Sequence, residues 1–351
     1  MRFLHDSLPQ RVRFASHEAA GQLAEEVGEL GASRVMVIAS EAAKESSERV
    51  AAGLPVAVWH HEVAMHVPVD VAFRAREAAA AHDVDALVAV GGGSTTGLAK
   101  AVALTTGLPI IAVPTTYAGS EATNVWGMTE ADRKTTGADD RVLPRTVVYD
   151  AALTLTLPVE VSVASGLNAL AHCVDSMWAP RADPINAVLA GEGIRALRAG
   201  LPAVKADPTG LEGREQTLYG AYLSAVAFAS AGSGLHHKIC HVLGGMFDLP
   251  HAPTHAVVLP HVLDFNGPAA PDAERRIALA FDAPSAGEGL AALRAELDAP
   301  VALRALGMPE DGIAPAVKAV LAVVPAGNPA LVTEDDLTAL LRAAWEGNLP
   351  R

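Results

Sequence analysis

The sequence predicts a two-domain protein in which an α/β domain with a parallel sheet, residues 1–157, precedes an all-α domain, residues 158–351. Short runs rich in Val and Ile alternate with amphipathic helical stretches through the first domain. After Leu157 and Pro158 the strand-like runs almost vanish, and long Ala/Leu-rich stretches dominate. A chain of 351 residues is also long for one hydrophobic core, which favours two domains.

Strands of the first domain are expected where Val and Ile cluster. Their ranges are 34–40, 55–60, 86–90, 109–113 and 146–150, and the opening VRFAS predicts one more strand near the N-terminus. Helical patterns, such as 17–30 and 69–82, separate the strands, and this alternation is typical of a parallel sheet covered on both faces. In the second domain, helices are expected over 161–178, 184–199, 211–230, 236–244 and 334–346.

The charge and composition exclude several classes of protein. The net charge of −14 argues against nucleic acid as a partner. No apolar run reaches about 18 residues, so no transmembrane helix is expected. The N-terminus has no signal-peptide core, so we expect a cytoplasmic protein. The two cysteines, Cys173 and Cys240, form no CxxC pattern, and we expect both to be reduced and buried.

A glycine-rich segment follows the strand at 86–90 and opens an apolar helix. In this segment, GGGSTTG, the bare backbones of Gly92 and Gly93 would let a phosphate approach, and the hydroxyls of Ser94 and Thr95 could donate to it. The segment is neither GxGxxG nor a Walker loop, because no GK[ST] follows. An ordinary strand-to-helix turn is the alternative interpretation.

A second hydroxyl-rich loop comes directly after the strand at 109–113. Loops at the carboxyl ends of parallel strands line ligand sites, and two such loops predict a nucleotide cofactor. NADH is the predicted cofactor. NADPH stays open, because Ala39 and Ser40 occupy the end of strand 34–40, where a carboxylate would repel a 2′-phosphate, and Glu41 comes only after them. Besides Ser40, the residues expected at the cofactor in this part of the chain are Thr115, Thr116, Tyr117, Ser120, Asn124 and Lys134.

Histidines are concentrated in residues 234–261, which hold six of the thirteen in the chain. His237 and His241 are four residues apart, so they share one face of a predicted helix, and His251 follows ten residues later. We expect the other three histidines of the segment to be structural or peripheral, and these are His236, His255 and His261.

Asn168 and His172 form another pair at the same helical spacing. Imidazoles on facing helices bind a metal, polarise a carbonyl or move a proton. A divalent cation would ordinarily take a carboxylate where Asn168 stands, so this residue decides between a metal site and a site without metal.

Several motifs are specific in combination, although each alone is weak. They are GGGSTTGLAKAVAL, PTTYAGSEATNVWGMTE, KTTG, VLPRTVVYD, SGLNALAHCVD and the segment from GLHHKICHVLGG to PHAPTHAVVLPH. Through them the chain resembles, over nearly its whole length, the maleylacetate reductases of the iron-containing alcohol dehydrogenase superfamily. The resemblance implies a dinucleotide-binding domain and a helical domain, an architecture shared with dehydroquinate synthase, and usually a homodimer.

The resemblance also implies a vestigial metal site. In metal-dependent members of the superfamily an Asp and three His hold the metal, and the matching positions here are Asn168, His172, His237 and His251. His241 matches a further site histidine that is not a ligand. Gly97 stands where metal-dependent alcohol dehydrogenases usually have Asp. Because the Asn168 amide is a poor partner for a hard cation, the resemblance implies no essential metal.

The implied activity is NADH-dependent reduction of the carbon–carbon double bond of maleylacetate, a dicarboxylate, to 3-oxoadipate. Hydride adds to the alkene carbon β to the ketone, and a histidine protonates the α carbon. The residues expected in the substrate pocket, by default a cleft between the domains, are Asn168, His172, His237, His241 and His251, with His241 or His251 as the proton donor.

Three alternatives stay open from the sequence. The first is an alcohol or aldehyde dehydrogenase of the same fold that depends on Fe²⁺ or Zn²⁺. The second is a zinc lyase resembling dehydroquinate synthase, which would need an intact metal set and more cationic phosphate ligands. The third is an oligomeric binding protein without catalysis, which two cofactor loops and a histidine cluster disfavour.

Overall fold

The computed structural model describes residues 2–130 and 133–350, apart from the side chains of residues 133 and 134. The chain divides into two compact units, an α/β unit of Leu8–Leu157 and a helical unit of Met1–Ser7 with Pro158–Arg351. The sequence did not indicate that the first residues group with the helical unit. There, the His5 ring lies 2.9 Å from the carboxylate of Asp183.

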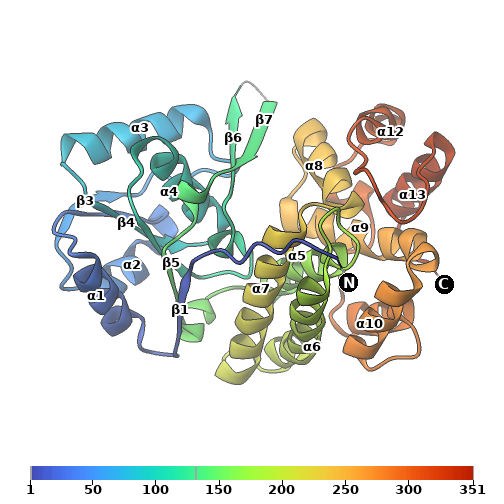
Figure 1. Ribbon diagram of the computed structural model, residues 1–351, viewed down its shortest axis with the longest axis horizontal. Helices are drawn as coiled ribbons and strands as arrows, with labels where there is room; N and C mark the ends of the chain where they lie inside the picture. The colour runs from blue at the N-terminus through green and yellow to red at the C-terminus, as the bar shows by residue number, and fades with distance from the viewer. Residues whose placement is uncertain (1, 131–132, 351) are drawn as a thin grey trace. The chain divides into compact units, whose positions relative to one another are not determined.

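The α/β unit is built on a six-stranded sheet in which every strand pair is parallel (Figure 1). The strand order is β1-β8-β5-β4-β2-β3. The strands are β1 (Arg11–Phe14), β2 (Val35–Ile38), β3 (Val56–His60), β4 (Ala86–Gly91), β5 (Ile110–Pro114) and β8 (Thr146–Tyr149). All six lie in or beside the predicted ranges, so the predicted parallel sheet is confirmed.

Helices cover both faces of this sheet. They are α1 (Ala19–Leu30), α2 (Lys44–Val50), α3 (Val69–Ala81) and α4 (Gly93–Thr106). Alternate residues of a strand face opposite sides. Met36 and Ile38 of β2 therefore pack in one hydrophobic core with α3 and α4, whereas Val35 and Val37 pack in another with α1 and α2. Burial on both sides explains why the strands are continuously apolar.

The order of the strands reverses between β2 and β4. From β2 the chain moves outward to the edge strand β3, then returns to β4 on the other side of β2 and continues to β5. Open α/β sheets usually bind ligands at such a switch point, beyond the carboxyl ends of the strands. In this unit the loops at the switch point begin with Ala39 after β2 and Gly92 after β4.

A two-stranded antiparallel ribbon also belongs to the α/β unit, and the sequence did not predict it. It pairs β6 (Val125–Glu130) with β7 (Arg133–Ala138). The Trp126 ring lies over Gly137, where a Cβ would approach the ring to 2.7 Å, so the glycine permits this cross-strand contact.

The second unit is helical, as predicted, and residues 158–350 contain no strand. Its helices are α5 (Val159–Ser176), α6 (Pro184–Ala206), α7 (Leu211–Ala231), α8 (Leu235–Phe247), α9 (His251–Asn266), α10 (Pro271–Phe281), α11 (Ala286–Glu296), α12 (Ile313–Leu321) and α13 (Glu334–Glu346). Among the described residues, no helix combines the length and the apolar character that a membrane span requires.

Helix α5 is the central helix of this unit. Every residue from Ser162 to Ser176 is buried, and α6, α7 and α9 pack around the helix. A polar side chain on such a helix is costly unless it is hydrogen-bonded or serves a function. Helix α5 carries three such residues in its second half, Asn168, His172 and Asp175.

Candidate active site

The turn from β4 into α4 forms a backbone cradle. Gly91 has a φ of +156°, and a Cβ there would lie 2.4 Å from the Thr95 hydroxyl. A Cβ on Gly92 would lie 2.9 Å from Cγ2 of Thr116. Within the described chain no side chain caps the N-terminus of α4, so its first N–H groups are available to an anion. The residues of this turn therefore fit the phosphates of a dinucleotide.

Most of the predicted cofactor residues lie at the carboxyl edge of the sheet. Ser40 follows β2, Gly92 follows β4 and Thr115 follows β5, and these three strands are neighbours. The predicted residues that are at least partly accessible are Ser40, Gly92, Gly93, Ser94, Thr115, Thr116, Ser120 and Asn124. Asn124 already donates to Asp140 Oδ1 at 2.8 Å. The side chain of Lys134 lies outside the described residues.

Two of the predicted cofactor residues, Tyr117 and Thr95, are buried in this structure. Tyr117 is completely buried, and Thr95 is 3% exposed because it lies beneath the tight turn at Gly91. In this structure they support the two loops from within the core.

A buried lysine that the sequence did not single out donates hydrogen bonds to the loop after β5. Lys100 of α4 is fully buried, and its Nζ donates to Thr123 O (2.7 Å), Thr123 Oγ1 (3.1 Å) and Val125 O (2.8 Å). Nearby, buried Glu121 accepts from the Tyr149 hydroxyl at 2.8 Å. Burial lowers the pKa of Lys100 to about 7 and raises the pKa of Glu121. The signal in the sequence was a lone lysine in the apolar stretch LAKAVAL.

Six histidines come together in the helical unit, and we call them the histidine cluster. They are His172 of α5, His236, His237 and His241 of α8, and His251 and His255 of α9. The ring centroids of His172 and His237 are 4.9 Å apart. Those of His251 and His255 are 4.3 Å apart. The cluster contains all four predicted catalytic histidines, and Asn168 lies one helical turn before His172.

Asp175 orients His237 from one end of the imidazole ring. Its Oδ2 lies 2.6 Å from His237 Nδ1 and accepts backbone N–H groups from Gly234 (3.0 Å) and His237 (3.3 Å). Burial nevertheless raises the pKa of Asp175 to about 7. The contact places the proton of a neutral His237 on Nδ1, which leaves Nε2, unpartnered among the described residues, with a lone pair. Asp175 was not among the residues predicted from the sequence, although Asp175 follows His172 by three residues on a buried helix.

His236 and His255 lie inside the cluster, so of the structural or peripheral positions expected for them, the structure shows the buried one. Both are completely buried, and His236 Nε2 lies 3.1 Å from the carbonyl oxygen of His255. Neither ring nitrogen of His255 has a partner among the described residues. The available signal was that His255 follows His251 by four residues, one turn of α9. His261, by contrast, is buried beside Arg294.

Burial keeps the inner histidines of the cluster neutral. The pKa falls to about 3 for His172, to about 4 for His236, and well below its ordinary value for His237 and His255. His241 and His251 are exposed, so they can exchange protons with water. The cluster thus offers neutral donors and acceptors inside and a solvent-linked pair outside.

The donor atoms of the cluster fit a divalent metal ion poorly. Ring nitrogens of His236, His237 and His255 lie within 4.8 Å of one another. Asp175 occupies His237 Nδ1 and the His255 carbonyl occupies His236 Nε2, so only the second nitrogen of each of these two rings is left to coordinate an ion. Asn168 adds an uncharged amide, whose buried oxygen has no partner among the described residues. A carboxylate at position 168 would offset part of the charge of a cation, and the amide does not.

The surroundings of Gly97 leave little room for a larger residue such as Asp. A Cβ at this position would lie 2.9 Å from Cγ2 of Val67. Val67 itself has a left-handed backbone conformation, with φ of +49°, which restricts its movement. An Asp at position 97 would therefore require Val67 to shift.

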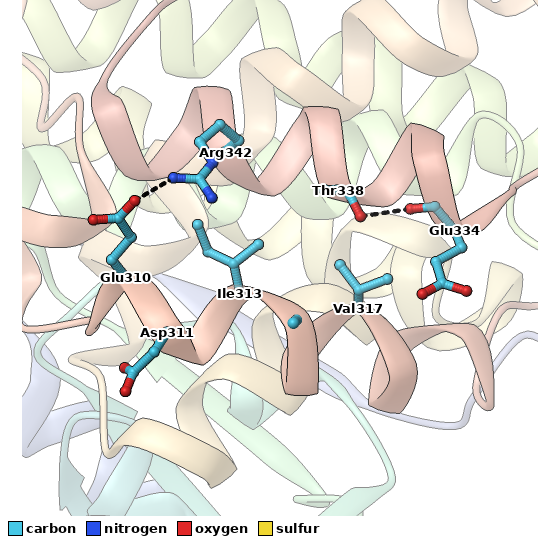
Figure 2. A pocket seen from close by; sticks show the side chains of 8 residues that line it. Glu310, Asp311, Ile313, Val317, Glu334, Thr338 and Arg342 are labelled. Carbon is cyan, nitrogen blue, oxygen red and sulfur yellow. Dashed lines mark hydrogen bonds and ion pairs between the residues drawn. The ribbon is translucent and has the colours of Figure 1, made fainter.

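A separate pocket of about 580 Å³ lies between α12 and α13 (Figure 2). It is lined by Glu310, Asp311, Ile313, Ala314, Val317, Glu334, Thr338 and Arg342. Arg342 donates to Glu310 at 2.5 Å, and the Thr338 hydroxyl donates to the Glu334 carbonyl at 2.8 Å. The pocket shares no residue with the histidine cluster, and we assign it no part in the chemistry.

Comparison with known proteins identifies relatives over the whole chain. The model of the family described as iron-containing alcohol dehydrogenase matches residues 9–151, and the model of its C-terminal part matches residues 162–345. The chain is 46% identical to maleylacetate reductase from Sphingobium indicum, in an alignment that covers 100% of this chain and 99% of that protein.

Solved structures show the same similarity. The iron-containing alcohol dehydrogenase from Corynebacterium glutamicum is 60% identical, with a TM-score of 0.97 over 98% of this chain and 97% of that one. Maleylacetate reductase from Agrobacterium tumefaciens is 42% identical, with a TM-score of 0.95 over 100% of both chains.

Proposed function

The chain belongs to the iron-containing alcohol dehydrogenase family and is an oxidoreductase, and we propose that it reduces the carbon–carbon double bond of maleylacetate to give 3-oxoadipate. We propose NADH as the reductant, with NADPH as the alternative, and no metal. Full-length relatives that carry the name maleylacetate reductase support the substrate. The observation that carries the proposed chemistry is a buried cluster of neutral histidines joined by an amide, Asn168, instead of a carboxylate.

A reduced nicotinamide dinucleotide, when bound, supplies a hydride to the alkene carbon β to the ketone. Addition at that carbon leaves an enolate, whose oxygen must be held by hydrogen-bond donors. We assign this task to the buried N–H groups of Asn168 and of neutral His172 or His255. An enolate is far less basic than an alkoxide, so such donors can hold it without a metal.

The proton for the α carbon comes, in this proposal, from His241 or His251. Both rings are exposed at the solvent side of the cluster, so either can take a replacement proton from water. The enolate collapses to the ketone as the carbon–hydrogen bond forms. One hydride and one proton are thus added across the double bond, and the ketone is retained.

An alcohol or aldehyde dehydrogenase that requires a metal is the second candidate. The 60% identity to the iron-containing alcohol dehydrogenase from Corynebacterium glutamicum favours it, as does the retention of three histidines at the matching positions. Such an enzyme must hold an alkoxide, for which a Lewis acid is needed. The neutral donor set around Asn168 argues against this candidate.

Three further features stay predictions. We expect the dicarboxylate substrate to be the only small-molecule partner besides the cofactor, the enzyme to be cytoplasmic, and the working form to be a homodimer. The large negative charge of the chain means that a dicarboxylate needs local donors, which the exposed His241 and His251 can supply.

Product analysis tests the proposed reaction. NADH deuterated at C4 of the nicotinamide is oxidised with maleylacetate, and the product is examined by mass spectrometry and NMR. We expect 3-oxoadipate with deuterium on the carbon β to the ketone. A hydroxy acid with deuterium on the former carbonyl carbon, or turnover of simple aldehydes alone, would show that the second candidate is correct.

A further inference from the structure

Helix α9 contains a carbonyl that its own backbone cannot satisfy. Pro260 lies inside the helix, and proline has no N–H to donate to the carbonyl four residues earlier. That carbonyl belongs to Ala256, which is completely buried. A buried carbonyl without a donor costs about 1–3 kcal/mol, so a replacement donor is expected.

Arg294 of α11 is that replacement. Its Nη1 donates to Ala256 O, and its Nη2 donates to Pro300 O at 2.8 Å. Arg294 is 4% exposed, and among the described residues no carboxylate pairs with it. A guanidinium buried against carbonyl groups alone is costly to desolvate. We infer that these two hydrogen bonds, which join α11 to α9, compensate for the cost of burying Arg294.

The contact between Arg294 and Ala256 is connected to the histidine cluster through the backbone of α9. Ala256 directly follows His255, whose own carbonyl lies 3.1 Å from His236 Nε2. Two successive carbonyls of α9 are therefore held by side chains of other helices. The His255 ring sits between its neighbours, with centroids 4.3 Å from His251 and 4.8 Å from His237.

We propose that Arg294 is a positioning residue for the reaction: by donating to the carbonyl that Pro260 leaves without a partner, it fixes the first turns of α9 and with them His251 and His255. Arg294 touches no substrate in this account and acts only through the backbone of α9. The catalytic part of the inference rests on the proposed function, whereas the placement of the rings does not.

A double substitution tests this inference directly. Arg294→Met removes the donor, and we expect kcat with maleylacetate to fall about 10- to 100-fold, with a much smaller change in KM for NADH. Pro260→Ala restores an N–H that can donate to Ala256 O. The Pro260→Ala/Arg294→Met enzyme should therefore recover kcat to within a few-fold of Pro260→Ala alone. A folded double variant with no recovery would overturn the inference.

Arg214→Met is the matched control. Arg214 is another fully buried arginine of the helical unit, and it donates to the carbonyl of Pro208 from two nitrogens. Its loss should lower thermal stability and leave kcat of the folded enzyme unchanged. An equal loss of kcat in both Arg→Met variants would reduce Arg294 to a structural residue and overturn the inference. If Arg294→Met does not fold, Arg294→Lys, which keeps one donor, takes its place with an intermediate loss.

A second readout does not depend on activity. In protein labelled with ¹⁵N-histidine, long-range ¹H–¹⁵N spectra report the tautomer of each ring. We expect the signals of His236 and His255 to change in Arg294→Met and to return in the double variant. A wild-type enzyme inactive with maleylacetate would refute the proposed function alone. Unchanged ring signals in Arg294→Met would refute the positioning role.

Discussion

Asp175 Oδ2 lies 2.6 Å from Nδ1 of His237, and the same oxygen accepts two backbone N–H groups at the start of α8. This contact links the central helix α5 to the helix that carries half of the histidine cluster. It fixes both the orientation and the tautomer of the His237 ring. The inner face of the cluster is therefore built before any substrate arrives.

Asp175→Asn should reduce catalysis without unfolding the protein. An amide can present N–H to His237 Nδ1, which would reverse the tautomer and move the proton to Nε2. We expect kcat to fall about 10- to 100-fold, as is usual when a partner that orients a histidine is lost. Asp183→Asn is the control, because Asp183 contacts His5 outside the cluster and should leave kcat unchanged. Steady-state kinetics decide, and full activity of Asp175→Asn would refute the orienting role.

Asn168→Asp should convert the cluster into a better metal site. A carboxylate in place of the amide adds an anion, and charges about 4 Å apart at an effective dielectric constant near 20 attract by about 4 kcal/mol. After desolvation we still expect Zn²⁺ to bind at least about tenfold more tightly, measured by calorimetry. Asn168→Ala, which removes the amide without adding charge, should show no gain. Equal affinities for all three proteins would mean that the four matching positions do not converge.

The histidine cluster should make the protein sensitive to acid. A histidine whose pKa is lowered in the folded state binds fewer protons than in the unfolded state, so its contribution to stability is full above about pH 6.5 and is lost as the pH falls. The relevant groups titrate at about 3 for His172 and about 4 for His236 and His261. Each should lower the free energy of unfolding by about 1.4 kcal/mol per pH unit in that window.

Asp175 acts in the opposite direction, because its raised pKa of about 7 lets the folded state hold an extra proton below that pH. The extra proton on Asp175 offsets the destabilisation caused by one histidine, and the free energy of unfolding still falls as the pH is lowered. Urea denaturation at about pH 7.5, 6 and 5 measures the slope. His236→Gln should reduce the slope by about one proton, whereas His82→Gln, at an exposed position, should not. A stability that does not change with pH would contradict the burial of neutral rings.

Lys100→Met should loosen the cofactor loop. The substitution leaves three oxygens of Thr123 and Val125, those of Thr123 buried, without their lysine donor, at a cost on the order of 3–5 kcal/mol. We expect a lower melting temperature and a higher KM for NADH, with little change in kcat at saturating cofactor. Lys44→Met is the control, because Lys44 is exposed. An unchanged KM for NADH would show that Lys100 does not hold the loop in the conformation that binds the cofactor.

The sequence was sufficient to predict the sheet and the helical spacing of the candidate site residues, because both are local patterns. The Val/Ile runs define β2, β4 and β5, and the i,i+4 spacing of Asn168 with His172 survives in α5 because a helix preserves it. The ribbon of β6 and β7 was missed because the apolar residues of β6 are interrupted by Gly127 and only partly buried, and β7 has no apolar run.

The roles of Asp175, His255 and Lys100 could not be read from periodicity. Each depends on a contact between elements that are distant in sequence: Asp175 meets α8 and Lys100 meets the loop after β5. The burial of His255 depends on the packing of α8 against α9, which the sequence does not show. The burial of Tyr117 could not be predicted either, since a loop residue can be buried when its neighbours are not.

We propose that this histidine cluster supports the reduction without a metal. The most direct measurement is the rate of NADH oxidation with maleylacetate by enzyme dialysed against a chelator, with its metal content determined by mass spectrometry. We expect the dialysed enzyme to oxidise NADH at the same rate as untreated enzyme. Added Fe²⁺ or Zn²⁺ should not change this rate. Loss of activity on chelation, with recovery only after one of these ions is restored, would contradict it.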